Sequence, residues 1–493
     1  MYDVIILGGG PAGVTAALRA RELGAETALI ERGRMGGTCT NDGCAPTRVL
    51  AKAARLAHEA RQFAEYGLEA PLPTINFSTV MERTQSVIYR LQEKKQLIDH
   101  LESVGVMTLH GVGDARFIDP HTVVLPDGRA LQARKFVICV GGSARRLAFP
   151  GSEHTLTHSD VWSLRELPAS VAIVGSGATG CQLASIFDAF GSQVTILDVA
   201  PRILAGEDEL VSAIMRSEFE RRGIRIITDS SGVERVEQVA DGFRLATRVE
   251  GEPLVLMAEA IIMAVGWPGN VSGLNLAAAG VEVDGGYIRV DDHLRTTAPH
   301  IFAAGDITGK MMLVQSASSQ ARVAVENALM PKPLFKIVHR LVPHGGFTEP
   351  EYGGVGLTEA QAAAQFDYTA AVVPYAELDR AVIDDRTVGF CKLIVDRATR
   401  RIIGGHVVGE QAVEVVQLLA AGMAAGATVE QLADLELAYP TYTAIVGLAA
   451  RDLVRQLNLV PVAEEWRMLR PVRGVEWERH AGQGNRFKMR DER

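Results

Sequence analysis

The chain has 493 residues, 47% of them hydrophobic, and a formal net charge of −9 at pH 7. Its length predicts two or three domains, and the acidic balance argues against nucleic-acid binding. No apolar run is long enough to cross a bilayer, because the longest, residues 415–429, is interrupted by glycines. The first expected strand starts at Tyr2, which argues against a signal peptide. Five cysteines with one close pair fit a reducing, cytoplasmic compartment.

The N-terminal residues follow the pattern of a βαβ nucleotide-binding unit. The apolar run Tyr2–Leu7 predicts a buried strand, residues 14–23 a helix and Thr27–Glu31 a second strand. Glu31 stands where a carboxylate that binds a ribose hydroxyl is expected. The intervening glycines let the backbone approach a pyrophosphate at the helix N-terminus. They form a G-x-G-x-x-G sequence at Gly8, Gly10 and Gly13.

The same pattern occurs a second time. Residues 171–174 and 193–197 predict strands, and Asp198 follows as the acid. The glycines of this second loop are Gly175, Gly177 and Gly180. Because each unit has its own ribose acid, two separate dinucleotide ligands are predicted. The alternative is a duplicated half of one larger site.

Cys39 and Cys44 form a Cys-x4-Cys pair just after the first unit. At a helix start, the dipole and the free N–H groups lower the pKa of a thiol. The alternatives are two unpaired buried cysteines or half of a zinc site, but zinc ligands are more often spaced Cys-x2-Cys with a second pair nearby. We therefore predict a redox-active dithiol and no metal site. The isolated cysteines are interpreted as small buried hydrophobes: Cys139, Cys181 and Cys391.

In order and spacing these motifs resemble those of the class I pyridine nucleotide-disulfide oxidoreductases, the family of dihydrolipoamide dehydrogenase, glutathione reductase and mercuric reductase. The resemblance runs from residue 1 to about residue 457. Further motifs in family order are Val140-Gly141-Gly142, Ile301-Phe302-Ala303-Ala304-Gly305-Asp306, Gly356-Leu357-Thr358-Glu359 and Gly389-Phe390-Cys391-Lys392. The resemblance implies an α/β fold with two Rossmann-like dinucleotide-binding domains, for FAD and NAD(P), and a C-terminal α/β dimerisation domain.

By this resemblance the first site takes FAD and the second takes NAD(P)H. Asp198 should accept from a 2′-hydroxyl and repel a 2′-phosphate, so NADH is the expected donor, although Arg202 lies close enough in sequence to soften the preference. The cofactor-binding residues implied are Gly8, Gly10, Pro11, Ala12, Gly13, Glu31, Arg32, Gly37, Thr38, Gly113, Gly142, Gly175, Gly177, Gly180, Asp198, Gly266, Gly305, Asp306, Met312 and Leu313.

The predicted domain borders are 1–149 and 270–335 for the two parts of the FAD-binding domain, 150–269 for the NAD(P)-binding domain, 336–457 for the dimerisation domain and 458–493 for a C-terminal tail. A helical hairpin is expected over residues 45–63 and 79–104. The tail contains Trp466 and Trp477. We expect it to be solvated and partly disordered, and docking on the body or on a partner protein is the alternative.

The resemblance also assigns roles. NAD(P)H passes a hydride to FAD, and the reduced flavin opens a Cys39–Cys44 disulfide. Cys44 is the thiol against the flavin, and its thiolate should form a charge-transfer complex with oxidised flavin. Cys39 is the outer thiol that faces the substrate. The family forms homodimers in which each active site takes groups from the partner's C-terminal segment.

Two pairs of positions depart from the family. The acid/base segment His-Pro-Thr-x-x-Glu has Tyr439 for His and Ala444 for Glu. A phenol with a reference pKa of about 10 is a poor base at neutral pH, which puts lipoamide or glutathione turnover in doubt. Beside the flavin, Arg48 and Gln182 replace Lys and Glu, and a guanidinium next to a neutral amide should stabilise reduced, anionic flavin. Two further single positions also differ from the family: Trp267 stands where the family usually has Arg, and Gln315 stands where His is common.

The identity of the electron acceptor stays open. Mercuric reductase also has Tyr in place of that His, and vicinal thiolates are good ligands of soft metals. However, the chain has no cysteine after Cys391 with which to deliver a metal ion. The candidates are a soft metal ion such as Hg(II), a small disulfide or an electron carrier. Two other classes are a flavin reductase for quinones or dyes that does not use the cysteines, and a partner-binding subunit of a larger redox assembly.

Overall fold

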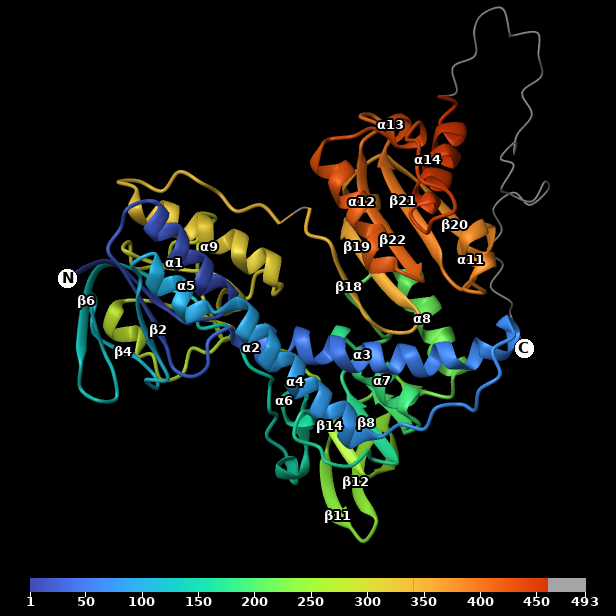
Figure 1. Ribbon diagram of the computed structural model, residues 1–493, viewed down its shortest axis with the longest axis horizontal. Helices are drawn as coiled ribbons and strands as arrows, with labels where there is room; N and C mark the ends of the chain where they lie inside the picture. Colours follow the sequence, from blue (N-terminus) through green and yellow to red (C-terminus); the bar gives the residue numbers. More distant parts are fainter. Residues whose placement is uncertain (340, 460–493) are drawn as a thin grey trace, which may run out of the picture. The chain divides into compact units, whose positions relative to one another are not determined.

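The computed structural model describes residues 1–339 and 341–459. It consists of two compact units (Figure 1). Among the described residues, the first comprises Met1–Gly175, Ile186–Val199 and Ser230–His339, and the second comprises Ser176–Ser185, Ala200–Asp229 and residues 341–459. The predicted C-terminal tail lies, from residue 460 onward, outside the described residues.

The first unit contains a sheet built around β1 (Tyr2–Leu7). β1 pairs in parallel with β2 (Thr27–Glu31) on one side and with β6 (Ala130–Ile138) on the other. Parallel neighbours need a crossover, and α1 (Pro11–Glu22) provides it. The sheet order is β3-β2-β1-β6-β5-β4, with β17 also paired to β6. The other strands are β3 (Met107–His110), β4 (Arg116–Asp119), β5 (Thr122–Val124) and β17 (Ile301–Ala303).

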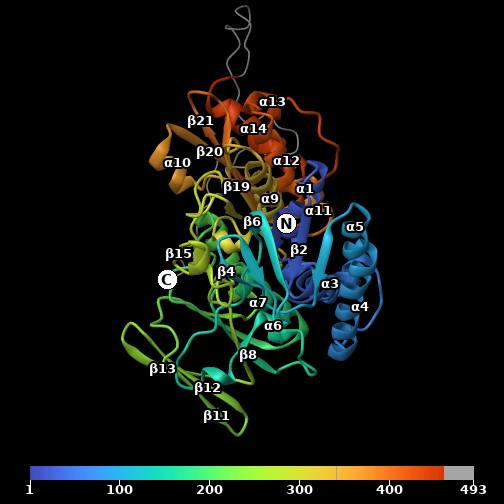
Figure 2. The ribbon, with the colours of Figure 1, turned by 90° about the vertical axis from the view of Figure 1, so that its left-hand side faces the viewer.

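Helices cover this sheet and extend from it. α1 packs against α9 (Val314–Leu329), and both bury alanine-rich faces (Figure 1). α1 begins at Pro11, before the start predicted from the pattern, because proline at the first helical position has its φ already set. The predicted hairpin is formed by α3 (Cys44–Glu59) and α4 (Phe77–Lys95), which lie side by side (Figure 2).

The second arm of that hairpin is not continuous. The pattern predicts helix over residues 79–104, but the chain turns at Gln96, which has a left-handed φ of 40°. α5 (Leu97–Ser103) therefore follows α4 as a separate helix. Two short elements complete this region: α2 (Gly37–Asn41) and η1 (Ala60–Tyr66).

The first unit also holds a second parallel sheet, in which β9 (Gln193–Leu197), β8 (Ser170–Val174), β14 (Ala260–Met263) and β7 (Leu156–Thr157) are neighbours in that order. An antiparallel sheet is formed by β11 (Arg235–Val239), β12 (Gly242–Val249) and β13 (Glu252–Ala258). Smaller elements are η2 (Ser152–His154), α6 (His158–Val161), η3 (Leu276–Ala279), β15 (Val283–Asp284), β16 (Tyr287–Ile288) and η4 (Asp306–Thr308). α7 (Ala178–Phe190) belongs to both units.

The second unit is centred on the antiparallel sheet β18-β19-β22-β21-β20. Its strands are β18 (His344–Gly346), β19 (Glu351–Gly356), β20 (Tyr368–Pro374), β21 (Phe390–Asp396) and β22 (Ile402–Gly409). α12 (Ala412–Ala424) packs on β19 and β22, and α14 (Ala444–Gln456) packs on β20 and β21. The other elements are α8 (Glu209–Arg221), β10 (Arg225–Ile227), α10 (Glu359–Gln365), η5 (Tyr375–Glu377), α11 (Asp379–Ile383) and α13 (Val429–Ala433).

These elements confirm the predicted α/β fold. They also confirm that the isolated cysteines are buried, because Cys139, Cys181 and Cys391 all lie in hydrophobic cores. Burial raises the pKa of Cys139 and of Cys391 to about 12, so neither thiol ionises at neutral pH.

Candidate active site

The first glycine loop joins β1 to α1 and is shaped by contacts that exclude side chains. Gly8 has a φ of +106°, and a Cβ there would collide with the carbonyl oxygen of Cys139. A Cβ on Gly13 would collide with the carbonyl oxygen of Gly8. Among the described residues no side chain caps the N-terminus of α1, so its first N–H groups can bind a ligand oxygen. This loop fits the pyrophosphate of FAD.

Glu31, the predicted ribose acid, ends β2 beside this loop. The N–H of Gly9 donates to its Oε2 at 2.6 Å, and the N–H of Gly33 donates to its Oε1 at 2.8 Å. The carboxylate is thus held in place, and each oxygen keeps a lone pair for a ribose hydroxyl. Two other predicted residues of this site also meet, because the N–H of Gly113 donates to the carbonyl of Arg32 at 3.0 Å.

Asp306 lies at the other predicted end of the FAD site, where it opens η4. Burial raises the pKa of its carboxyl. A buried carboxylate needs hydrogen-bond donors, and the hydroxyls of a ribityl chain are donors of that kind. The preceding Gly305 is fixed by its N–H, which donates to Oε1 of the buried Gln320 at 2.8 Å.

The remaining predicted FAD residues take positions around these groups. Pro11 and Ala12 open α1, and Leu313 is the N-cap residue of α9 after the exposed Met312. Gly37 and Thr38 open α2. A Cβ on Gly37 would lie 2.7 Å from the Cα of Gly10, and a Cβ on Gly142 would lie 2.7 Å from Nε1 of Trp267. The backbone is therefore closely packed at both positions.

The predicted NAD(P)H residues are divided between the two units. Gly175, Asp198 and Gly266 belong to the first unit, and Gly177 and Gly180 belong to the second, as does Gln182, which is predicted to act beside the flavin. Gly175 has a φ of +102°, and a Cβ there would collide with the carbonyl oxygen of Ala264, as at Gly8. The backbone of Asp198 is anchored by Ser230, whose N–H and hydroxyl both donate to the Asp198 carbonyl, at 3.1 and 2.9 Å.

The predicted dithiol is held at the start of α3. Cys44 is the first residue of that helix, and Cys39 lies in the short helix α2. Both are present as thiols, Cys39 half-buried and Cys44 exposed. A hydrogen bond from Cys44 lowers the pKa of Cys39 to about 7, against the opposing effect of burial, and the charge of Lys95 lowers it further. The same hydrogen bond raises the pKa of Cys44. At pH 7 about half of Cys39 is therefore ionised while Cys44 keeps its proton, whereas the family resemblance leads to the expectation of a Cys44 thiolate.

The loop between the two cysteines is tied to α6. The hydroxyl of Ser159 donates to Oδ2 of Asp42 at 2.6 Å, and Nε1 of Trp162 donates to the Asp42 carbonyl at 2.7 Å. His158 is buried on the same helix, with Nε2 3.2 Å from the Ser159 hydroxyl, and its ring packs against Trp267 at a centroid distance of 4.9 Å. Burial lowers the pKa of His158, so its imidazole is neutral at pH 7.

The C-terminal candidate residues lie in the second unit. Tyr439 is 55% exposed, and its hydroxyl donates to Oδ2 of Asp379 at 2.7 Å. Ala444 is the first residue of α14. The amide of Gln182 is engaged within the unit, because its Oε1 accepts from the N–H of Phe347 at 3.2 Å and its Nε2 donates to the carbonyl of Ala178 at 3.0 Å.

The first unit brings together Cys39, Cys44 and Arg48, which is exposed on α3. The sequence argument missed Asp42, Ser159 and His158, although Asp42 lies between the two cysteines. It also missed Asp379, which replaces the absent Glu as the carboxylate partner of residue 439. Within residues 1–339 and 341–459, no group of three or more His, Cys, Asp or Glu is arranged to hold a metal ion. None of the helices in that part of the chain has the length and apolar composition of a membrane span.

Comparison with known proteins identifies the family. The profile of the pyridine nucleotide-disulphide oxidoreductases matches residues 2–321, and the profile of their dimerisation domain matches residues 342–450. Dihydrolipoyl dehydrogenase of Chlorobaculum tepidum is 32% identical over 93% of this chain and 98% of the relative. Mercuric reductase of Bacillus cereus is 31% identical over 91% of this chain and 71% of the relative.

Solved structures give the same result. The chain resembles the HOCl-induced flavoprotein disulfide reductase RclA of Escherichia coli, with a TM-score of 0.80, 27% identity and coverage of 91% of this chain and 99% of that one. LpdA of Mycobacterium tuberculosis gives a TM-score of 0.82 with 28% identity and the same two coverages. The predicted cofactors, FAD and NAD(P)H, and the dimerisation domain are thereby confirmed. The chain belongs to the pyridine nucleotide-disulphide oxidoreductases, a family of enzymes that transfer electrons between NAD(P)H, FAD and a redox-active disulfide.

Proposed function

We propose that the protein takes electrons from NAD(P)H and delivers them, through Cys39 and Cys44, to a soft metal ion such as Hg(II) or Cu(II). The dithiol carries this proposal. It presents two neighbouring sulfurs, and the hydrogen bond from Cys44 lowers the pKa of Cys39 to about 7. A thiolate beside a second sulfur is a good ligand for a soft metal ion. A small disulfide is the second candidate acceptor.

The C-terminal segment favours the metal ion. Exchange with a disulfide substrate needs a base that takes and returns a proton at the outer thiol. The hydroxyl of Tyr439 instead donates a hydrogen bond to Asp379, which supports a role for its oxygen as a metal ligand rather than as a base. Two of the compared proteins also support a metal ion: one relative is named mercuric reductase, and RclA has been solved as a Cu(II) complex.

The chemistry of the site follows from its residues. FAD, when bound at the first glycine loop, supplies the transfer of two electrons from NAD(P)H to the disulfide. Cys39, the thiolate, then binds the metal ion, and Cys44 loses its proton as the second sulfur binds. Closing of the disulfide releases two electrons, which reduce one Hg(II) or two Cu(II) ions. The hydrogen bonds from α6 hold the intervening loop through this cycle.

The direct test is NADH and NADPH oxidation by the purified protein with Hg(II), Cu(II), lipoamide, glutathione disulfide and a quinone, in wild type and Cys39→Ser. We expect turnover with a metal ion that is lost in the variant. Full activity of Cys39→Ser would contradict the proposal and identify a flavin reductase that does not use the cysteines. Turnover of disulfides alone would establish the second acceptor.

We also propose that NADH is preferred over NADPH, because the carboxylate of Asp198 should repel a 2′-phosphate. The ratio of kcat/KM for the two cofactors measures this preference, and Asp198→Ala should reduce it. A higher kcat/KM for NADPH in the wild type would refute the proposal.

We further propose a cytoplasmic homodimer formed through the dimerisation domain, in which Tyr439 serves the dithiol of the partner. Sedimentation should give twice the chain mass. Mixing Cys39→Ser with Tyr439→Phe chains should then give heterodimers that keep one intact site.

A further inference from the structure

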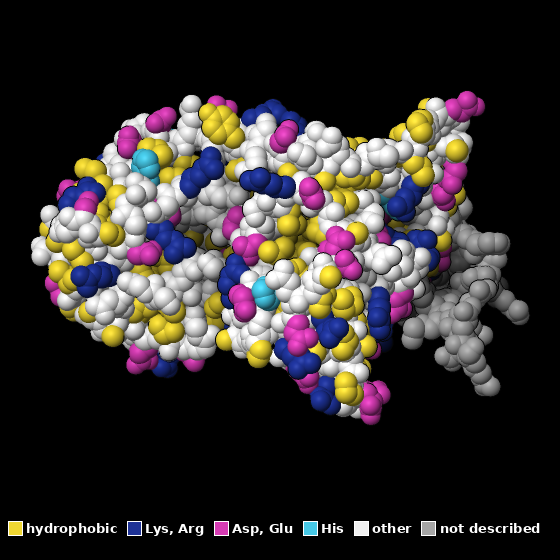
Figure 3. Space-filling view, turned by 90° about the horizontal axis from the view of Figure 1, so that it is seen from below, with side chains coloured by type: hydrophobic (Ala, Val, Ile, Leu, Met, Phe, Trp, Pro, Cys, Tyr) yellow, Lys and Arg dark blue, Asp and Glu magenta, His cyan; other side chains and the backbone are white. Residues whose placement is uncertain are grey.

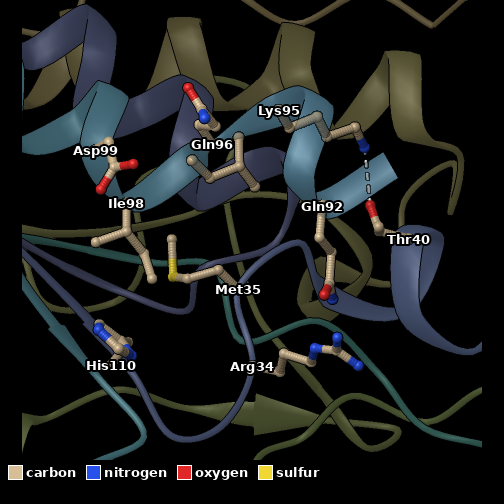
Figure 4. A pocket seen from close by; sticks show the side chains of 10 residues that line it. Arg34, Met35, Thr40, Gln92, Lys95, Gln96, Ile98, Asp99 and His110 are labelled. Carbon is tan, nitrogen blue, oxygen red and sulfur yellow. Dashed lines mark hydrogen bonds between the residues drawn. The ribbon is translucent and has the colours of Figure 1, made fainter. Parts of the chain in front are cut away.

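A cavity of about 350 Å³ lies in the first unit, beside the predicted FAD residues, because Arg34 and Met35 of its lining lie in sequence between Arg32 and Gly37. It is half open and is lined by the loop after β2, by α2, by the end of β3 and by the junction of α4 with α5 (Figure 4). Its volume is in the range of small-molecule sites. The lining residues are Arg34, Met35, Thr40, Gln92, Lys95, Gln96, Leu97, Ile98, Asp99 and His110. None of them is in the predicted FAD or NAD(P)H set.

The lining has an excess of basic groups. Arg34, Lys95 and His110 face the cavity, and Asp99 is its one carboxylate. Arg34 and His110 approach from one side, and Lys95 and Asp99 from the other (Figure 4). Within the part of the chain that the structure describes, the guanidinium of Arg34 makes no hydrogen bond or ion pair. A guanidinium on a cavity wall is a ready partner for a carboxylate or a phosphate.

The rest of the wall is apolar or neutral. Met35 is buried and contacts the cavity together with Leu97 and Ile98. In Figure 4 the side chains of Met35 and Ile98 lie near His110, and Gln92 lies between Arg34 and Lys95. A ligand that fills the cavity therefore needs an apolar stem as well as an anionic group.

The cavity is connected to the dithiol through Lys95. The Nζ of Lys95 donates to Oγ1 of Thr40 at 2.8 Å, drawn as a dashed line in Figure 4. Thr40 is buried and directly follows Cys39. The charged groups that act on Cys39 are Lys95 and Asp306, besides its partner Cys44. An anion bound to Lys95 would neutralise the only cation of this set.

We propose that this cavity binds a small organic anion, a carboxylate or phosphate on a short apolar stem, and that occupancy makes Cys39 less reactive. The proposed binding site depends only on the cavity and its lining residues. The proposed effect on Cys39 also rests on the proposed function of the dithiol. Arg34 and Lys95 would hold the anionic group, and Met35, Leu97 and Ile98 would contact the stem.

Binding is tested on the FAD-loaded full chain by titration calorimetry, with n-butyl phosphate as the probe and inorganic phosphate for comparison. A charge-assisted hydrogen bond contributes about 1.5–3 kcal/mol, so Arg34→Gln and Lys95→Gln should each weaken butyl phosphate binding roughly tenfold or more. Asp99→Asn should tighten it, since a repelling carboxylate is removed. Lys94→Gln, outside the cavity, is the matched control. Absence of saturable binding, or binding that Arg34→Gln and Lys95→Gln leave unchanged, would overturn the site.

The effect on the dithiol has a separate readout. In the reduced protein, the rate of Cys39 alkylation by iodoacetamide at pH 7, followed by mass spectrometry, should fall several-fold when butyl phosphate saturates the site. Lys95→Gln should be slow without the ligand and insensitive to it. Calorimetric binding without any change in alkylation would overturn the coupling. Neither measurement depends on metal turnover, so a failure of the proposed function would be seen separately.

Discussion

At the scale of single residues, the replacement of a His–Glu pair by Tyr439 and Ala444 has the clearest chemical consequence. The structure shows that the hydroxyl of Tyr439 has a new carboxylate partner, Asp379, at 2.7 Å. A carboxylate that accepts from a phenol favours its protonated form. The pair therefore orients a donor, whereas the pattern it replaces orients a base.

This geometry predicts little lipoamide or glutathione turnover, at least about 100-fold below a family member with the His–Glu pair, which is the low end of the contribution of a positioned acid/base. Steady-state kinetics with both disulfides measures it. Tyr439→His combined with Ala444→Glu should raise disulfide turnover. Robust turnover by the wild type would show that another residue supplies the base.

At the scale of elements, the loop between the cysteines depends on α6. Losing the two hydrogen bonds to Asp42, each contributing about 1 kcal/mol, should make local opening easier. In Ser159→Ala/Trp162→Phe, the loss of about 2 kcal/mol in total should speed up hydrogen exchange of residues 39–44 roughly 30-fold. Ser163→Ala is the control, because its hydroxyl donates to the Asp160 carbonyl in α6 and not to the loop between the cysteines. Equal exchange in all three proteins would show that the tether does not hold the loop.

Whether a feature could be predicted from the sequence depends on how far apart along the chain its interacting residues lie. The glycine loops and the dithiol are encoded by neighbours in the chain, so their spacing was enough to predict strands, helices and dithiol. Asp42 and Ser159 are 117 positions apart in the chain, and Tyr439 and Asp379 are 60 positions apart. No local sequence pattern predicts either of these two contacts. The break at Gln96 was also missed, because a left-handed φ is unusual for any residue other than glycine.

At the scale of the whole molecule, the second unit is held by a buried ion pair between distant segments. The Nζ of Lys392 contacts Oδ1 of Asp208 at 2.6 Å and Oε2 of Glu359 at 2.7 Å, and the side chains of Lys392 and Asp208 are only 5% and 1% exposed. Burial alone would raise the pKa of Asp208, but the hydrogen bonds from Lys392 and from the Glu359 N–H outweigh it, so the pKa is lowered.

Lys392→Met should destabilise the protein by about 3–5 kcal/mol, since it leaves Asp208 buried without its cation. Denaturant unfolding of the FAD-loaded protein measures this. Arg397→Met removes an exposed ion pair with Asp367 and should change stability by less than about 1 kcal/mol. Because the pKa of Asp208 is lowered in the folded state, its contribution is present above about pH 4 and is lost as the pH falls further. Equal destabilisation by the two variants would refute the role of the buried pair.

The hydrogen bond between the two thiols also sets how the driving force of the enzyme responds to acidity. Below pH 7 the reduced pair carries two protons, whereas above it only Cys44 keeps one, because the pKa of Cys39 is about 7. For each proton taken up on reduction, the midpoint potential of a two-electron couple shifts by about 30 mV per pH unit. The midpoint potential of the Cys39–Cys44 couple should therefore fall by about 60 mV per pH unit below neutrality and by about 30 mV above it. Acidification thus makes the disulfide a stronger oxidant, and the midpoint potential rises more steeply per pH unit below pH 7 than above it. Redox titrations across pH 5 to 9 would show this change of slope.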